Sequence, residues 1–190
     1  MDTEFLDTIT SESDRGCVLL AVSLLDESLK ALLHTAFVDD PHVQREAVQP
    51  LFKGQIPPLR PFAITINLAY ALGLIDRSTF ATLHALREIR NEFSHRVAPA
   101  ALTDDRVAQI VDRLSLPEQI RACIEQMADH YTGRIEVLEH QQLVQLTCEP
   151  GLSRQRMIFT TSVALLNATI ISKTTHIRAE CRTANPINSQ

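Results

Sequence analysis

Glycine, tryptophan and aromatic residues in general are scarce in this chain of 190 residues. It has 5 glycines and no tryptophan, and aromatic residues make up 5% of the sequence. So few glycines argue against a fold with many tight β-turns and against a glycine-rich phosphate loop. The shortage of aromatics weakens any interpretation based on stacking nucleic-acid bases, without excluding it. Hydrophobic residues still make up 45%, so the composition favours a compact, helical, soluble protein.

Signals for metal binding, secretion and membrane insertion are also missing from the sequence. The four cysteines are scattered and form no C-x-x-C pair, which favours free thiols and no metal or cofactor. The N-terminal segment is acidic and does not resemble a signal peptide, and the longest apolar runs, 17–25 and 163–171, are too short to span a bilayer. We therefore expect a cytoplasmic protein without membrane contact.

The net charge is −5, from 18 basic and 23 acidic residues. A protein that coats polyanions without selectivity is basic, so any contact with nucleic acid must use a local patch of positive charge.

Apolar periodicity predicts an all-α protein, a single antiparallel bundle of about six to seven helices. Residues 134–148 fit either a helix or a short hairpin, and the polar residues from Arg178 on are expected to fray. The expected helices cover residues 14–36, 41–52, 62–72, 77–97, 103–114, 117–132 and 153–177.

The helix expected at 77–97 carries a strip of reactive polar side chains. With 100° per residue and Arg87 set at zero, Arg90 falls at about −60° and His95 at about +80°. The apolar residues fill an arc on the opposite side, so one side is expected to be buried and the other displayed. Asn91 and His95 are four residues apart and are expected to touch. We call the displayed set the polar strip; it contains His84, Arg87, Arg90, Asn91, Ser94 and His95.

These side chains suit phosphodiester chemistry. A guanidinium binds phosphate and stabilises the charge of the transition state, and an imidazole can accept or donate a proton near neutral pH. With RNA the internal 2′-OH supplies the nucleophile, so no metal is needed. One helix offers few groups, and two copies facing each other in a homodimer would make a more complete site. The alternative is an ordinary solvent-facing surface in which Arg87 pairs with Glu88 and Glu92.

Two resemblances bear on this choice. The segment Arg90-Asn91-x-x-x-His95 resembles the motif of the HEPN superfamily of helical domains. A wider resemblance, over residues 13–115, is to proteins of the mannitol operon repressor-like family, with residues 116–180 completing one helical domain and 181–190 forming a tail. The segments that carry this second resemblance are Ser13–Gly16, Leu24–Leu29, Pro50–Phe52, Pro57–Leu59, Leu68–Ile75 and Leu102–Asp105.

The two resemblances imply different functions. The HEPN resemblance implies a dimeric, metal-independent endoribonuclease, of the kind found among toxins and defence effectors, with Arg90 and His95 catalytic and Asn91 supporting them. The supporting or RNA-binding residues would be Arg87, Ser94, Arg96 and Asp26. The mannitol operon repressor resemblance implies a non-catalytic transcriptional regulator that acts through protein partners, because the chain shows no basic helix-turn-helix. The intact motif favours the ribonuclease as the main hypothesis; a regulator and a nucleotide-binding helical module are the alternatives.

Other polar residues have weaker signals. Asp26 either orients Arg90 or His95 or simply faces solvent, and His34 is expected to be a surface or packing histidine. Arg154 and Arg156 could form a phosphate-binding rim, although an ordinary solvated helix start fits them better. The last expected helix has an apolar face interrupted by polar residues, which suggests packing against another helix or a dimer partner; these residues are Thr160, Thr161, Ser162, Asn167 and Thr169.

Overall fold

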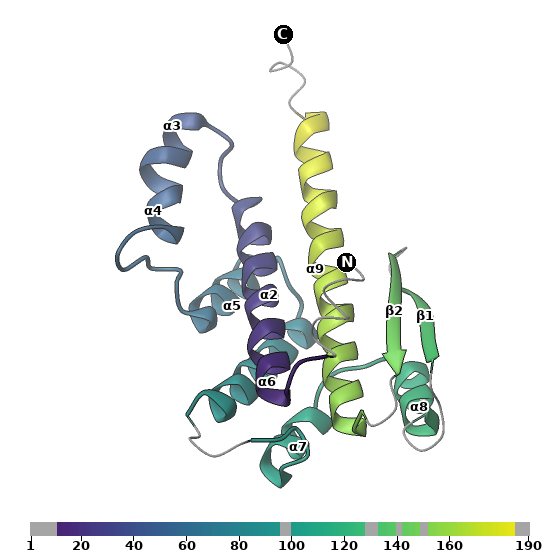
Figure 1. Ribbon diagram of the computed structural model, residues 1–190. Coiled ribbons are helices and arrows are strands. Elements are labelled where there is room, and N and C mark those ends of the chain that lie inside the picture. The colour runs from purple at the N-terminus through teal and green to yellow at the C-terminus, as the bar shows by residue number, and fades with distance from the viewer. Residues whose placement is uncertain (1–10, 96–99, 128–132, 140–141, 149–151, 185–190) are drawn as a thin grey trace.

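The computed structural model describes residues 11–95, 100–127, 133–139, 142–148 and 152–184 (Figure 1). In chain order, the elements are α2 (Asp14–His34), α3 (Pro41–Val43), the π-helix η1 (Gln44–Val48), α4 (Gln49–Phe52), α5 (Phe62–Ala71), α6 (Arg77–His95), α7 (Asp105–Asp112), α8 (Glu118–Met127), β1 (Gly133–Glu139), β2 (Gln142–Cys148) and α9 (Arg154–Ala184).

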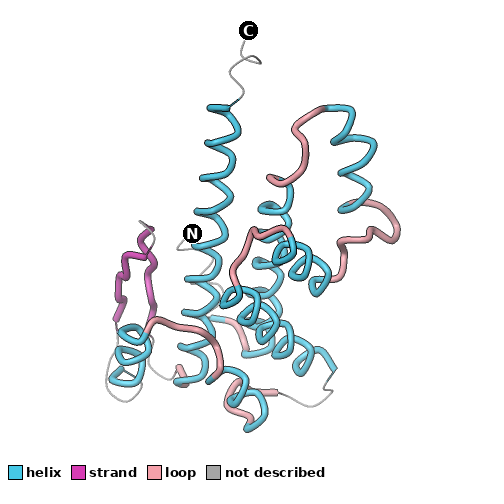
Figure 2. Tube along the Cα trace, turned by 180° about the vertical axis from the view of Figure 1, so that it is seen from behind, coloured by secondary structure: helices cyan, strands magenta, loops and turns pink. Residues whose placement is uncertain are grey.

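Helix α9 is the central element of the molecule. The arm formed by α3, η1 and α4 lies on one side of it and the hairpin of β1 and β2 on the other (Figures 1 and 2). Every residue from 156 to 168 is buried. The segment Arg154–Glu180 is long and apolar enough to cross a membrane by length and composition, but 78% of its most apolar window is buried within the protein. We therefore interpret α9 as the core helix of the bundle.

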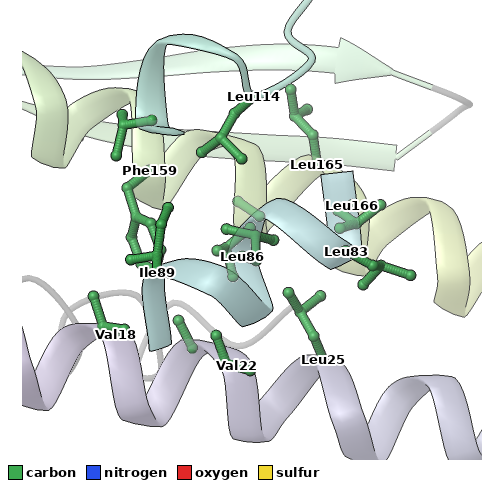
Figure 3. Packing of buried hydrophobic residues seen from close by; sticks show 14 of the residues in the cluster. Val18, Val22, Leu25, Leu83, Leu86, Ile89, Leu114, Phe159, Leu165 and Leu166 are labelled. Atoms are coloured by element: carbon green, nitrogen blue, oxygen red, sulfur yellow. The ribbon is translucent and has the colours of Figure 1, made fainter. Parts of the chain in front are cut away.

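The core forms where α2, α6 and α9 meet. Figure 3 shows Val18 and Val22 of α2 directed towards Leu86 of α6, with Phe159 of α9 packed above them. All four side chains are fully buried. One apolar cluster runs from Cys17 near the start of α2 to Ile170 in α9, so the helices share one core. Burying this surface is the main force that stabilises the fold.

The helix boundaries follow capping chemistry that is visible in the sequence. The Ser13 side chain accepts a hydrogen bond from the backbone N–H of Gly16 and begins α2. The Asp76 carboxylate accepts one from the N–H of Thr79, at 2.7 Å, in the first turn of α6. Gly73, with φ of 69°, follows α5 in the left-handed conformation that favours glycine. These capping roles explain why the bounds of α2, α5 and α6 agree with the sequence analysis to within about two residues.

The structure corrects the expectation of one regular helix over residues 41–52. The helix begins at Pro41 as predicted, with Asp40 as its cap, but a π-helical segment interrupts it at Gln44–Val48. Pro50 lacks an N–H and cannot donate to the carbonyl four residues earlier, while the Gln49 N–H donates instead to the carbonyl of Gln44.

Two further expectations are refined in the C-terminal region. Residues 133–148 form an antiparallel hairpin, with a register from Gly133 opposite Cys148 to Glu139 opposite Gln142. The all-α prediction is confirmed for the bundle, to which this hairpin is added beside α9. The expectation that the chain frays from Arg178 on is wrong as far as Ala184, because α9 continues to that residue.

Candidate functional site

The polar strip lies on α6, a helix that packs against α2, α5 and α7. On the side facing α7, the acidic residues of α6 are paired: Glu92 with Arg106 at 3.0 Å and Glu88 with Arg113 at 3.8 Å. The sequence analysis offered Arg87 as the partner of these two glutamates. In the structure, Glu92 and Glu88 pair instead with Arg106 and Arg113.

The C-terminal end of the strip is open to solvent. Asn91, Ser94 and His95 are all exposed. The hydroxyl of Ser94 donates to the backbone carbonyl of Arg90 at 2.8 Å, so it is used within its own helix. Among the described residues no hydrogen bond joins Asn91 and His95, and their predicted contact stays a prediction. Arg96 lies outside the described residues.

Arg90 occupies a different position from His95. It is half-buried, and it lies close enough to Asp26 of α2 to affect the ionisation of that carboxyl. Two residues five positions apart point about 140° away from each other on a helix. Arg90 therefore faces the seam between α6 and α2, whereas His95 faces solvent.

Asp26 is the acidic group of this seam. Its carboxylate accepts a hydrogen bond from the Lys30 ammonium at 2.8 Å, and its Oδ1 is buried without a hydrogen-bond partner among the described residues. Burial raises the pKa of the Asp26 carboxyl above its ordinary value, while the positive charges of Lys30 and Arg90 act in the opposite direction. The sequence left open whether Asp26 orients Arg90 or His95 or simply faces solvent; in the structure its side chain is half-buried and near Arg90.

The N-terminal end of the strip belongs to a contact between helices. His84 lies 3.1 Å from the amide oxygen of Asn67 on α5, and its ring meets the edge of Phe80 with the ring centres 4.6 Å apart. Burial, and after it the charge of Arg87, lowers the pKa of His84. The Nε of Arg87 is buried and has no hydrogen-bond partner within the described chain. Although the sequence analysis placed it in the displayed strip, His84 is therefore a packing histidine.

The basic residues at the start of α9 have structural roles. Arg154 pairs with Asp112 at 2.7 Å and with Glu125 at 2.5 Å, and it thereby ties α9 to α7 and α8. Arg156 pairs with Asp14 at 2.9 Å. The idea of a phosphate-binding rim at these two arginines is therefore wrong, because their guanidinium groups are engaged by carboxylates.

The pair of Arg156 and Asp14 was not found by sequence reasoning. Asp14 also accepts a hydrogen bond from the backbone N–H of Leu102 at 2.8 Å, which connects the segment after α6 to the start of α2. The two charged residues are separated by 142 positions, so no local pattern indicates that they meet.

His34 is also a packing residue. The ring of His34 stacks on that of Phe52 with the centres 4.1 Å apart, which attaches the arm to α2. Cys17 is buried and Cys123 exposed, and both are free thiols. No cluster of three or more metal-ligating side chains occurs among the described residues.

The arrangement on α6 suits recognition better than catalysis by a single chain. A general base needs a neighbouring group to orient it, and across the described residues His95 has none. Arg90 and His95 do not converge on a common point. What the strip does offer is an exposed imidazole and amide beside a half-buried guanidinium, which are groups that can bind a partner.

Comparisons with known proteins give a consistent result. A family model described as the mannitol repressor matches residues 3–173. The mannitol operon repressor of Escherichia coli strain K12 is 29% identical over 139 residues, which are 70% of this chain and 68% of that protein.

Two solved structures share the fold. The X-ray structure of the MtlR–HPr complex from Escherichia coli has a TM-score of 0.61 at 22% identity and covers 88% of this chain and 96% of that one. A possible transcriptional regulator, YggD from Shigella flexneri, has a TM-score of 0.67 at 16% identity and covers 90% of this chain and 99% of that one.

Proposed function

The chain belongs to the mannitol repressor family, and from this premise we propose that it is a non-catalytic transcriptional regulator that acts by binding a protein partner. The family match supports the regulatory role, and it reverses the order of the two hypotheses drawn from the sequence. We further propose that the partner is HPr, the protein found with the similar repressor in its crystal structure.

The exposed C-terminal end of the polar strip is the observation that carries the proposal. Other charged groups of the bundle are used internally, as in the pairs of Glu92 with Arg106 and of Arg154 with Glu125. Asn91 and His95, in contrast, are exposed at the end of a rigid helix and have no side-chain hydrogen bond within the described chain. The helix fixes only the backbone of these two residues, so a partner that binds them has to order their side chains but not the main chain.

The overall charge favours a protein as the partner. At −5 the chain is a poor match for the phosphate backbone of DNA, to which binding depends on many positive contacts. An effect on transcription is more easily explained if the chain sequesters or delivers another protein. In this proposal the protein is cytoplasmic, as the sequence predicts.

A reporter assay tests the regulatory role. An Escherichia coli strain that lacks its own mannitol operon repressor, and that carries a reporter under the mannitol promoter, should regain repression when this chain is expressed. The double variant N91A/H95A should lose most of that repression at an unchanged protein level. The control is Gln109→Ala, which changes an exposed residue of α7 and should repress like the wild type. A wild-type chain that leaves the reporter fully active would contradict the regulatory role.

Calorimetry tests the partner separately. Purified HPr titrated into the wild-type chain should give saturable heat, and N91A/H95A should bind at least tenfold more weakly, a difference of about 1.4 kcal/mol. If the wild type and N91A/H95A bind HPr equally well, HPr remains the partner but Asn91 and His95 do not contact it.

A metal-independent ribonuclease is the second candidate, favoured by one observation: Asn91 and His95 are open to solvent and not buried in packing. Since Arg90 and His95 diverge on one helix, such an activity would need two chains at a composite site. Incubation with RNA in EDTA should then yield 2′,3′-cyclic phosphate ends in the wild type and no cleavage in His95→Ala. Stabilisation by nucleotides without cleavage would instead indicate a nucleotide-binding module.

A further inference from the structure

Helix α5 has an exposed surface without charge. No charged residue occurs between Arg60 and Asp76. Nevertheless Ile64 is 46% exposed, Tyr70 41% and Leu72 49%. The outward surfaces of helices in soluble proteins normally carry charged side chains, and a continuous exposed apolar surface marks a site of interaction.

Ile64, Asn67 and Ala71 lie on one face of the helix, and Tyr70 and Leu72 lie at its two edges. Ile64, Asn67 and Ala71 follow the spacing i, i+3, i+7, and the residues between them that point the other way are buried against α2 and α6. The stacked rings of Tyr70 and Phe80, with centres 4.5 Å apart, continue the surface onto α6. We call this surface the α5 face; it consists of Ile64, Asn67, Tyr70, Ala71 and Leu72.

We propose that the α5 face is covered by the α5 face of a second copy of this chain, with the two helices antiparallel across a two-fold axis. In such an interface each residue near the axis meets its own copy, so a charged residue there would be repelled by itself. The uncharged stretch that contains α5 meets this requirement along its whole length. Ala71, a small residue, allows the two helices to approach closely.

The charges at the two ends of this stretch favour the antiparallel orientation. Arg60 is exposed just before α5 begins, and Asp76 follows soon after the helix ends. Hydrogen bonding from Thr79 lowers the pKa of Asp76, so its carboxylate is charged at neutral pH. Two antiparallel copies bring each Arg60 towards the end of the other helix, where the partial negative charge of the carbonyls and Asp76 attract it. A parallel arrangement would bring Arg60 against its own copy.

This dimer leaves the partner-binding end of the polar strip free. Phe80, which borders the α5 face, is separated from His95 by about 22 Å along α6, at 1.5 Å per residue. The sequence analysis expected the two polar strips to face each other; the two-fold axis proposed here lies on α5 instead. Dimerisation and binding of a regulatory partner are then compatible.

Sedimentation velocity over a dilution series tests the proposal. The wild-type chain should be dimeric at high concentration, and Ile64→Glu should be monomeric over the same range with an unchanged circular dichroism spectrum. Ala71→Arg, a second exposed position on the face, should give the same result if the first variant folds poorly. The matched control is Val43→Glu, which places the same charge at an exposed apolar residue of α3, in the arm (Figure 1); it should remain dimeric.

Three outcomes would overturn the proposal: a wild-type chain that is monomeric throughout, a dimer that survives Ile64→Glu and Ala71→Arg, and a dimer that Val43→Glu dissolves equally well. If the wild-type chain is monomeric throughout, the α5 face is not a contact between two copies of this chain, and a different protein would have to cover it.

Cross-linking tests the orientation. Asn67 lies near the middle of α5, so Asn67→Cys should form a disulfide-linked dimer under mild oxidation faster than the wild type does. Leu72→Cys, at the end of the same face, should form this dimer slowly, because the two copies of that position lie at opposite ends of an antiparallel pair. Equal rates at the two positions would contradict the antiparallel arrangement.

Discussion

Helices α9 and α6 both contain polar residues among apolar ones, but they use them differently. In α9, Ser162 and Asn167 are buried and make their hydrogen bonds within the protein: the hydroxyl of Ser162 donates to the carbonyl of Ile158 at 2.8 Å, and the Asn167 amide oxygen accepts from Ser28 at 2.6 Å. In α6 the polar side chains stand at the edge of the bundle, and Asn91 and His95 face solvent. The same residue types stabilise the fold in one helix and are available for binding in the other.

The difference arises from the surroundings of each helix. A helix enclosed on all sides must satisfy its polar groups internally, since a buried group without a hydrogen bond costs about 1 to 3 kcal/mol. A helix at the edge can leave them to water at little cost. Substitutions should therefore strongly affect stability in α9 and function in the exposed part of α6.

The largest loss of stability is expected from Phe159→Ala in α9. This ring is fully buried, and Figure 3 shows it above Val18 of α2 and beside Ile89 of α6. Removing it should lower the free energy of unfolding by about 3 to 5 kcal/mol, because both the transfer energy and the resulting cavity contribute. Urea denaturation followed by circular dichroism measures this value. A loss below about 1 kcal/mol would show that α9 is not enclosed as described.

A smaller loss is expected from Arg156→Met at the start of α9. The substitution keeps the apolar stem but leaves Asp14 without its cation, in a place where the arginine side chain is 11% exposed. We expect the free energy of unfolding to fall by about 2 to 3 kcal/mol, somewhat less than for a fully buried pair. The double variant D14N/R156M should recover part of the loss. If the single and double variants were equally stable, the ion pair would not be the cause.

The two helices also differ in how well the sequence predicted them. The bounds of α6 and its buried and displayed sides follow from strong amphipathic periodicity, and the exposure of His95 agrees with that pattern. Arg90 was placed in the displayed polar strip, whereas the structure shows it half-buried beside Asp26. A helical wheel gives directions only, and it cannot show which neighbouring helix fills each direction.

Helix α9 could not be placed at the centre of the bundle by the same reasoning. Its polar residues interrupt the apolar pattern, which left open whether another helix or a second chain covers them. The contact of Asn167 with Ser28 of α2 supports the first alternative. Long-range pairs such as Arg156 with Asp14 depend on the completed fold and leave no local trace in the sequence. The proposed roles of Arg87, Arg90, Asn91, Ser94 and His95 remain predictions.

A pH-dependent effect is expected at His34 of α2, which lies beside the C-terminal part of α9. Burial lowers the pKa of His34, and the nearby positive charges of Arg178 and Lys53 act in the same direction. The unfolded chain, with the ordinary value of 6.5, therefore binds more protons in the window between the two pKa values. Stability should be complete above pH 6.5 and decrease as the pH falls towards the folded-state pKa.

Chemical denaturation of the wild type and of His34→Gln, between about pH 5.5 and 8, measures the contribution of His34 to the free energy of unfolding. Most carboxyl groups titrate below this pH range. The wild type should lose more stability than the variant on acidification, although His84 adds a change of the same sign in both. An identical pH dependence would exclude His34 as a source.

The smallest effect on stability is expected from N91A/H95A in α6. Both side chains are exposed and make no hydrogen bond within the described chain, so the free energy of unfolding should change by less than about 0.5 kcal/mol. The same variant should lose repression and partner binding, so stability and function would separate on one helix. Thermal unfolding and the reporter assay, measured on the same preparations, check both parts. If the unfolding temperature of the variant is several degrees below that of the wild type, these side chains stabilise the fold. Its loss of repression would then be explained by unfolding and not by lost binding. A variant with full stability and reduced repression would show that the exposed end of α6 is kept for a partner and not for the fold.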